Sequence, residues 1–169
     1  RTDHPKQQVA KALTMVKTYE MLYDNLFLSR GLAAISLNNA VEKIFEYHCE
    51  GLAGKARPAL IVTGGENIKF EKSDYLFHYM NELMANSFEH AFLATSDPAI
   101  TIAVKYVKPI YSITYKDNGP GLPVHREETI PGKGLWYIRA YATQNLRGNL
   151  EVSNDNGTEY KLTFNENLI

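Results

Sequence analysis

The chain has 169 residues, a formal net charge of −1 and a single cysteine, Cys49. The near-neutral charge gives no electrostatic reason to expect a nucleic-acid partner or an anionic membrane surface. A lone cysteine excludes an internal disulfide, and no apolar run approaches the roughly 18 residues of a membrane span. We therefore expect a reducing, cytoplasmic location and no membrane contact by these residues. Arg1 is not a natural start, so we also expect the chain to be part of a longer protein.

The first third of the chain predicts two helices. Residues 6–28 lack Pro and Gly, and apolar side chains recur there at spacings of three and four, at Ala12, Met15, Tyr19, Leu22 and Leu26. Because this seam covers only about two heptads, a helix packed on its own domain and a helical-bundle interface both remain open. Ser36 is expected to cap a second helix that ends near His48, and GLAGKARP then breaks the chain.

The remaining residues predict a mixed domain. PALIVTGG, IKF, NLEV and TEYKLTF each indicate a strand, and so do two stretches with alternating apolar side chains. The alternation places Ile100, Ile102, Val104 and Tyr106 on one face of the first stretch, and Tyr111, Ile113 and Tyr115 on one face of the second. Pro109 separates them, which suggests an antiparallel hairpin, and NGPGLP must be loop.

Two further helices complete the expected order. Ser73 and Asp74 are expected to cap a helix over residues 75–92, and another helix is expected over residues 135–145. Helices on one face of a mixed, mostly antiparallel sheet follow from this order, so the expected fold class is a two-layer α+β sandwich with an N-terminal helical extension.

The helix over residues 75–92 carries polar groups that its apolar character does not explain. Glu82, Asn86 and Glu89 lie one turn apart, on a different face from the side chains that can pack on a sheet. These apolar side chains are Leu76, Met80, Leu83, Phe88 and Ala91. A solvated polar stripe is one interpretation. The other is a carboxylate base beside an amide oxygen that ligates Mg²⁺, which takes few protein ligands when phosphates supply the rest.

Two glycine-containing stretches add to this pattern. DNGPGLP follows a strand, and its glycines permit close backbone approach, while Asp117 can accept a hydrogen bond from an exocyclic amine such as that of adenine. PGKGLWYI opens a helix, whose free N–H groups and positive dipole end bind phosphate, with Lys133 as an added charge. Taken singly, an ordinary turn and a flexible loop explain the two stretches equally well, and neither has P-loop or dinucleotide spacing.

In this order, NELMANSFEHAF, DNGPGLP and GKGLWYI resemble the N box and the two glycine boxes of the GHKL ATPase superfamily, which includes gyrase, the Hsp90 chaperones, histidine kinases and the MutL proteins. NGTEYKLTF is similar to the closing Gly-Thr strand of that domain. ALTMVKTYEMLYDNLFLS and ISLNNAVEKIFEYH extend the likeness to sensor histidine kinases of the HisKA_2/HWE type. The resemblance implies a Bergerat-type ATP-binding fold, with a second dimerisation helix and linker helix over residues 1–53 and an ATP-binding catalytic domain over residues 54–169.

The resemblance also implies roles for individual residues. Glu82 would polarise or deprotonate the attacking nucleophile, Asn86 would hold Mg²⁺ on the triphosphate, and Asp117 would take the adenine amine. Gly119 and Gly121 would let the base lie close, and Thr158 would support the nucleotide pocket from the last strand. The other implied nucleotide contacts are the lid end and phosphate-binding helix start at Gly132, Lys133, Gly134 and Leu135, and His90 near the phosphates or ribose.

The implied activity is transfer of the ATP γ-phosphoryl group to a histidine that this sequence lacks, and from there to a response regulator, by a homodimer formed through the N-terminal helix. These residues alone would bind ATP. Glu89 stands where such kinases usually have lysine, and Trp136 where a glycine is common. Two alternatives stay open: an anti-sigma-factor-type serine kinase, which Glu89 suits, and a degenerate GHKL domain that serves as a protein-interaction module.

Overall fold

The computed structural model describes residues 34–52, 56–65, 67–93, 95–122 and 133–168, together with six positions among the first 33. Those six, Val9, Leu13, Val16, Lys17, Glu20 and Asp24, are helical and exposed. The predicted seam at Ala12, Met15, Tyr19, Leu22 and Leu26 lies outside the described residues.

The described elements follow one another in a mixed order. They are β1 (Ala34–Ser36), α2 (Leu37–Glu50), β2 (Ala59–Thr63), β3 (Asn67–Lys69), α3 (Phe70–Asn86), the π-helical turn η1 (Ser87–Ala91), β4 (Ala99–Val107), β5 (Ile110–Asp117), α4 (Lys133–Ala140), a second π-helical turn η2 (Tyr141–Asn145), β6 (Asn149–Asn154) and β7 (Thr158–Asn165).

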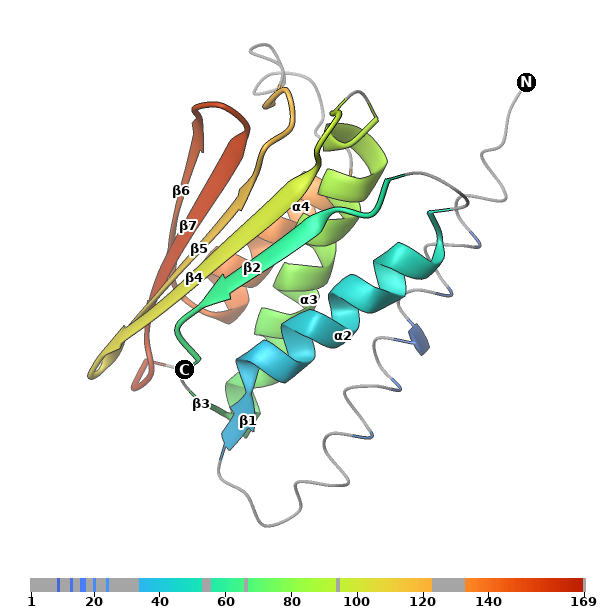
Figure 1. Cartoon of the computed structure of the whole chain (residues 1–169). Helices are drawn as coiled ribbons and strands as arrows, with labels where there is room; N and C mark the ends of the chain where they lie inside the picture. The colour runs from blue at the N-terminus through green and yellow to red at the C-terminus, as the bar shows by residue number, and fades with distance from the viewer. Residues whose placement is uncertain are drawn as a thin grey trace.

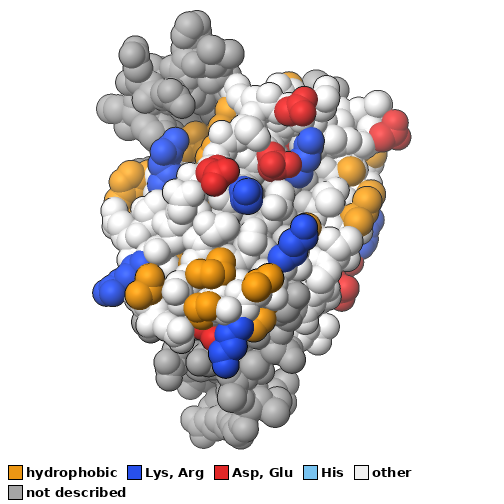
Figure 2. Space-filling view, turned by 90° about the vertical axis from the view of Figure 1, so that its left-hand side faces the viewer, with side chains coloured by type: hydrophobic (Ala, Val, Ile, Leu, Met, Phe, Trp, Pro, Cys, Tyr) orange, Lys and Arg blue, Asp and Glu red, His pale blue; other side chains and the backbone are white. Residues whose placement is uncertain are grey.

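Five of the strands form one mixed sheet in the order β2-β4-β5-β7-β6. β2 runs parallel to β4, and all other neighbours are antiparallel. Helices α2, α3 and α4 lie on one face of this sheet (Figure 1). The opposite face carries charged side chains of both signs beside scattered apolar ones (Figure 2). The predicted two-layer α+β fold is therefore confirmed.

The core lies between the sheet and the helices, where the strand alternation predicts it. Ile100, Ile102 and Val104 of β4 are buried, and so are Tyr111, Ile113 and Tyr115 of β5. The antiparallel register sets Ile102 opposite Tyr115 and Val104 opposite Ile113. From the helix side, α3 contributes Leu76, Met80 and Leu83, all buried as expected.

Helix boundaries differ from the prediction in one place that matters. α3 begins at Phe70, so Ser73 and Asp74 lie inside its first turns, and the prediction that they cap the helix is wrong. The chain passes from β3 into α3 with no loop between them. Ser36 does precede α2 as predicted, but its side chain makes no capping hydrogen bond.

Helix α2 packs against α3 and buries one side in the same core. Its buried side chains are Leu37, Ala40, Val41, Ile44 and Phe45. At its end, His48 Nε2 donates a hydrogen bond of 3.2 Å to Asn81 Oδ1 of α3. The division of the chain between residues 53 and 54 stays a prediction. Among the described helices, none has the length and apolarity that a membrane crossing requires.

Candidate functional site

The carboxylate of Asp117 is the most highly connected polar group of the candidate site. β5 ends at this residue, which is only 4% exposed. Its Oδ1 accepts hydrogen bonds from the backbone N–H groups of Gly119 (3.0 Å) and Thr158 (3.3 Å). Its Oδ2 accepts one from the Ser87 hydroxyl (2.9 Å). The side chain therefore joins the ends of α3 and β5 to the following loop and to β7.

Two glycines allow the backbone to close around Asp117. A Cβ at Gly157 would lie 1.8 Å from the Asp117 carbonyl oxygen, and Gly157 has φ = 121°, where side chains are strained. A Cβ at Gly119 would lie 2.4 Å from the Cβ of Ala91 in η1. These positions bring the loop after β5 against the helix layer and against β7.

Two asparagines hold that loop in place. Asn118 accepts a hydrogen bond from the Ala99 N–H and donates one to the Asp97 carbonyl, both at 2.8 Å. Asn154 of β6 accepts from the Leu122 N–H (2.9 Å) and donates to the Leu122 carbonyl (3.0 Å). Sequence reasoning missed both, because asparagine in a glycine-containing stretch indicates a turn without indicating the distant backbone it will bind.

The polar stripe of α3 converges on the first turn of α4. A Cβ at Gly134 would lie 2.9 Å from Asn86 Oδ1 and 3.5 Å from Glu82 Oε2. The predicted residues Glu82 and Asn86 are therefore brought together with the helix start that contains Gly134. Gly132 and the side chain of Lys133 lie outside the described residues, although Lys133 begins α4. Leu135 packs on the core, and Trp136 is exposed.

The Asn86 amide fits the role of a ligand-binding group. Its Nδ2 is buried and has no hydrogen-bond partner among the described residues, which is a costly arrangement for a polar atom. Rotation of the side-chain amide by 180° exchanges its nitrogen and oxygen, so the position that Nδ2 occupies can present either an N–H donor or an oxygen. An oxygen there suits Mg²⁺, which needs only one or two protein ligands when phosphates complete its shell. No three His, Cys, Asp or Glu side chains gather as a metal site in the described ranges.

The helix that carries these groups changes its winding beside them. The five residues after Asn86 form the π-helical turn η1, and the Phe92 N–H donates to the Ser87 carbonyl at 3.0 Å. π-Helical turns are rare and often lie at functional sites. In this turn Ser87 is buried, whereas Glu89 and His90 are exposed and approach each other to 3.9 Å. Ser87 was missed by sequence reasoning, because its position between Asn86 and Phe88 gave no signal of a distant partner.

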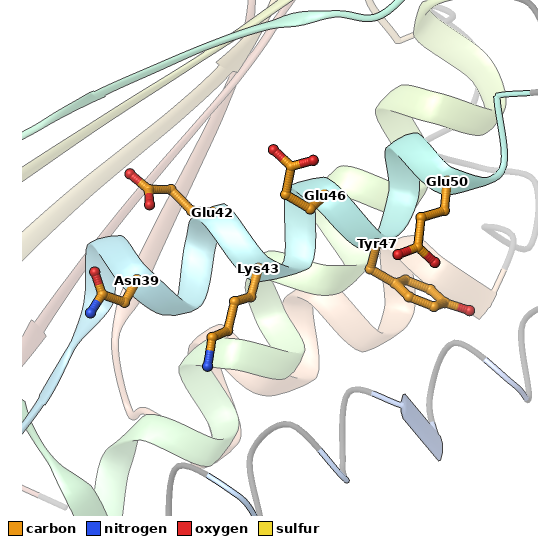
Figure 3. Close-up of a pocket in the computed structure, with 6 residues that line it drawn as sticks. All are labelled: Asn39, Glu42, Lys43, Glu46, Tyr47 and Glu50. Carbon is orange, nitrogen blue, oxygen red and sulfur yellow. The ribbon is translucent and has the colours of Figure 1, made fainter.

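A separate hollow of about 430 Å³ lies along α2. Figure 3 shows that Glu42 and Glu46 point to one side of the helix, and Lys43 and Tyr47 to the other. None of the predicted site residues lines it. Lys17 of the N-terminal region lies over the Tyr47 ring (5.0 Å to the centroid) and forms an ion pair with Glu50 at 4.0 Å.

Comparison with solved structures finds histidine kinases. The histidine kinase domain from the Erythrobacter litoralis EL346 blue-light activated histidine kinase has a TM-score of 0.75 at 18% identity, over 91% of this chain and 74% of that one. A longer structure of that kinase has a TM-score of 0.77 at 18% identity, over 94% of this chain and 49% of that one. The Acinetobacter baumannii histidine kinase AdeS has a TM-score of 0.62 at 16% identity, over 95% and 81% of the two chains. Likeness at these identities shows the fold.

The family comes from the sequence match. Residues 71–168 match the family described as histidine kinase-, DNA gyrase B-, and HSP90-like ATPase. A search of curated proteins finds no match. The expected GHKL resemblance is thereby confirmed, whereas the HisKA_2/HWE subgroup stays a prediction. Because the match spans more than half of the chain, the chain belongs to the family of histidine kinase-, DNA gyrase B- and HSP90-like ATPases.

Proposed function

We propose that this chain is the ATP-binding catalytic part of a two-component sensor histidine kinase. It would transfer the γ-phosphoryl group of ATP to a histidine outside these 169 residues, and that histidine would pass it to a response regulator. Family membership and the kinase-like fold support ATP chemistry. The observation that carries the proposal is the buried Asn86 Nδ2 atom, which lacks a hydrogen-bond partner among the described residues and lies in a side chain beside Gly134 at the start of α4.

The adenine end of the site is built around Asp117. Its carboxylate accepts a hydrogen bond from the exocyclic amine of the base, and the absence of side chains at Gly119 and Gly121 lets the base lie close. Thr158 supports this arrangement through the hydrogen bond that its N–H donates to Asp117.

The phosphate end is built from α3 and the start of α4. The free N–H groups of the first turn of α4, with Gly132, Lys133, Gly134 and Leu135, receive the phosphates. Asn86 holds Mg²⁺, which neutralises phosphate charge as phosphoryl transfer requires. Glu82, one helical turn earlier, orients the nucleophile or takes its proton. His90 is exposed on η1, so its role would be limited to the rim near the ribose or phosphates.

The partners follow from this chemistry. The phosphorylated histidine lies on another segment, and we propose that the full kinase is a cytoplasmic homodimer joined through the N-terminal helix. An anti-sigma-type kinase would instead phosphorylate serine on a partner. In a protein that contains the acceptor, acid-labile phosphohistidine supports the first assignment and acid-stable phosphoserine the second.

The proposal is tested by calorimetric titration of ATP into the wild type and Asn86→Ala, with and without Mg²⁺. Loss of the Asn86 ligand should weaken Mg²⁺-dependent binding at least tenfold, about 1.4 kcal/mol. Asn39→Ala is the matched control, because Asn39 is exposed on α2 and lies outside the site. Wild-type-like, Mg²⁺-dependent binding by Asn86→Ala contradicts the metal role. Absence of any ATP binding by the wild type favours the degenerate interaction module.

A further inference from the structure

Three buried oxygen atoms form a chain beneath the proposed adenine contact. The Tyr115 phenol oxygen lies 2.9 Å from Ser87 Oγ, and Ser87 Oγ lies 2.9 Å from Asp117 Oδ2. The exposed fractions of Tyr115, Ser87 and Asp117 are 0%, 1% and 4%. Hydrogen bonds this deeply buried are not exchanged for bonds to water, so losing one leaves a polar atom unsatisfied.

The direction of the two bonds follows from the number of protons available. An ionised carboxylate only accepts, so the Ser87 hydroxyl must donate its single proton to Asp117. Ser87 can then only accept from Tyr115. Burial raises the pKa of Tyr115 well above its usual range, which keeps the phenol protonated and able to donate. The chain therefore runs from Tyr115 to Ser87 to Asp117.

Every described group that hydrogen-bonds to the carboxylate is thus a donor. The Gly119 and Thr158 N–H groups occupy Oδ1, and Ser87 occupies one acceptor position of Oδ2. A carboxylate offers about four acceptor positions in all. This set of donors fixes the plane of the Asp117 side chain, and Oδ2 retains an acceptor position for a further donor.

We propose that Ser87, backed by Tyr115, is a positioning residue that sets the preference of the site for a 6-amino over a 6-oxo purine. This inference rests on the proposed function. A 6-amino purine donates to the free position of Oδ2, whereas a 6-oxo purine presents an acceptor to an acceptor and leaves both groups unpaired. Discrimination of this kind requires that the carboxylate neither rotate nor turn into a donor, because mismatched buried polar groups are what reject the wrong ligand.

The test compares ATP with inosine triphosphate (ITP), in which a 6-oxo group replaces the 6-amino group and N1 changes from a hydrogen-bond acceptor to an N–H donor. Ser87→Ala should weaken ATP binding about tenfold and leave ITP binding nearly unchanged, so that the ATP-to-ITP affinity ratio falls about tenfold. Tyr115→Phe keeps the Ser87 hydroxyl and should shift the ratio in the same direction by a smaller factor. Ser112→Ala, on the opposite face of β5, is the matched control and should leave the ratio unchanged.

An unchanged ATP-to-ITP affinity ratio in Ser87→Ala would overturn the inference. Equal weakening of both nucleotides would show a purely structural role, and unchanged affinities would show no role in binding. A second readout needs no nucleotide: amide hydrogen exchange at Gly119 and Thr158 should accelerate in Ser87→Ala, because both N–H groups share the carboxylate that Ser87 holds. Unchanged exchange overturns the positioning role. If wild-type protein binds neither nucleotide, the proposed function fails, while the exchange measurement still decides whether Ser87 holds Asp117.

Discussion

Gly134→Ala should separate nucleotide binding from folding, because the two respond to the added methyl group with opposite signs. The new Cβ would lie 2.9 Å from Asn86 Oδ1, 3.4 Å from Asn86 Nδ2 and 3.5 Å from Glu82 Oε2. Comfortable contacts of a methyl carbon begin at roughly 3.5 Å. The Asn86 amide must therefore retreat by about half an ångström, which is enough to misplace a ligand of Mg²⁺.

The folded state should tolerate the same change. The atoms that the methyl group meets are the ends of two side chains, which can move, and Gly134 lies in α4. Alanine is favoured over glycine in a helix by up to about 1 kcal/mol. We expect Mg²⁺-ATP binding to weaken about tenfold, or about 1.4 kcal/mol. The thermal midpoint should stay unchanged or rise by about 2–4 °C.

Calorimetric titration and a thermal melt on the same preparation check both effects. Gly51→Ala is the matched control, because its Cβ would meet only the His48 carbonyl at an ordinary 3.6 Å. It should change neither quantity. Wild-type ATP affinity in Gly134→Ala would refute the idea that the contact between α3 and α4 forms the phosphate end. A parallel loss of affinity and thermal midpoint would show damage to the fold instead.

Three further substitutions have distinct expected outcomes. In a longer kinase that contains the acceptor histidine, Glu82→Gln should bind ATP nearly normally but autophosphorylate about 10²–10⁴-fold more slowly; equal losses of affinity and rate would remove the base assignment. Burial lowers the pKa of His48 from 6.5 to about 4, so the neutral ring is the folded form. The contribution of the neutral ring to the free energy of unfolding is complete above pH 6.5 and declines by up to about 1.4 kcal/mol per pH unit as the pH falls from 6.5 towards 4. Urea titrations over this pH range should show a smaller dependence of stability on pH in His48→Phe. An unaltered dependence would assign it to other groups. Gly157→Ala should lower the free energy of unfolding by about 2–4 kcal/mol. Gly157 has φ = 121°, and the new Cβ would lie 1.8 Å from the Asp117 carbonyl oxygen. Wild-type stability in chemical denaturation would contradict this close approach.

Local patterns predicted the strands and their buried faces. Side chains on a strand alternate strictly, so Ile102 and Ile113 could be assigned to the core without knowing their partners. The order of the three polar and glycine-containing stretches predicted the family, and the structure places Glu82, Asn86 and Gly134 next to one another. Periodicity decides which residues share a face, and the strand predictions needed nothing more, whereas the family prediction rested on the resemblance of those stretches to known motifs.

Contacts between elements were beyond the reach of those patterns. Ser87 meets Asp117 across thirty positions of sequence, and that contact depends on how a helix sits on a sheet, which no local spacing encodes. The turn η1 could not be predicted from local spacing either. A π-helical turn after Asn86 differs from a regular α-helix only in which carbonyl groups a few backbone N–H groups bind. Asn118 and Asn154 could form local turns or distant bonds with equal ease.

The two edges of the five-stranded sheet differ in how they meet other protein molecules. β6 carries an exposed row of polar residues that includes Asn149, Glu151 and Ser153, which discourages the addition of another strand. β2, with the sequence ALIVT, has neither charge nor proline, and within the described ranges it pairs with β4 alone. Its outer row of backbone N–H and C=O groups is a template for a further strand. Aggregation of concentrated protein would therefore begin at β2, so solubility depends on what lies over that edge.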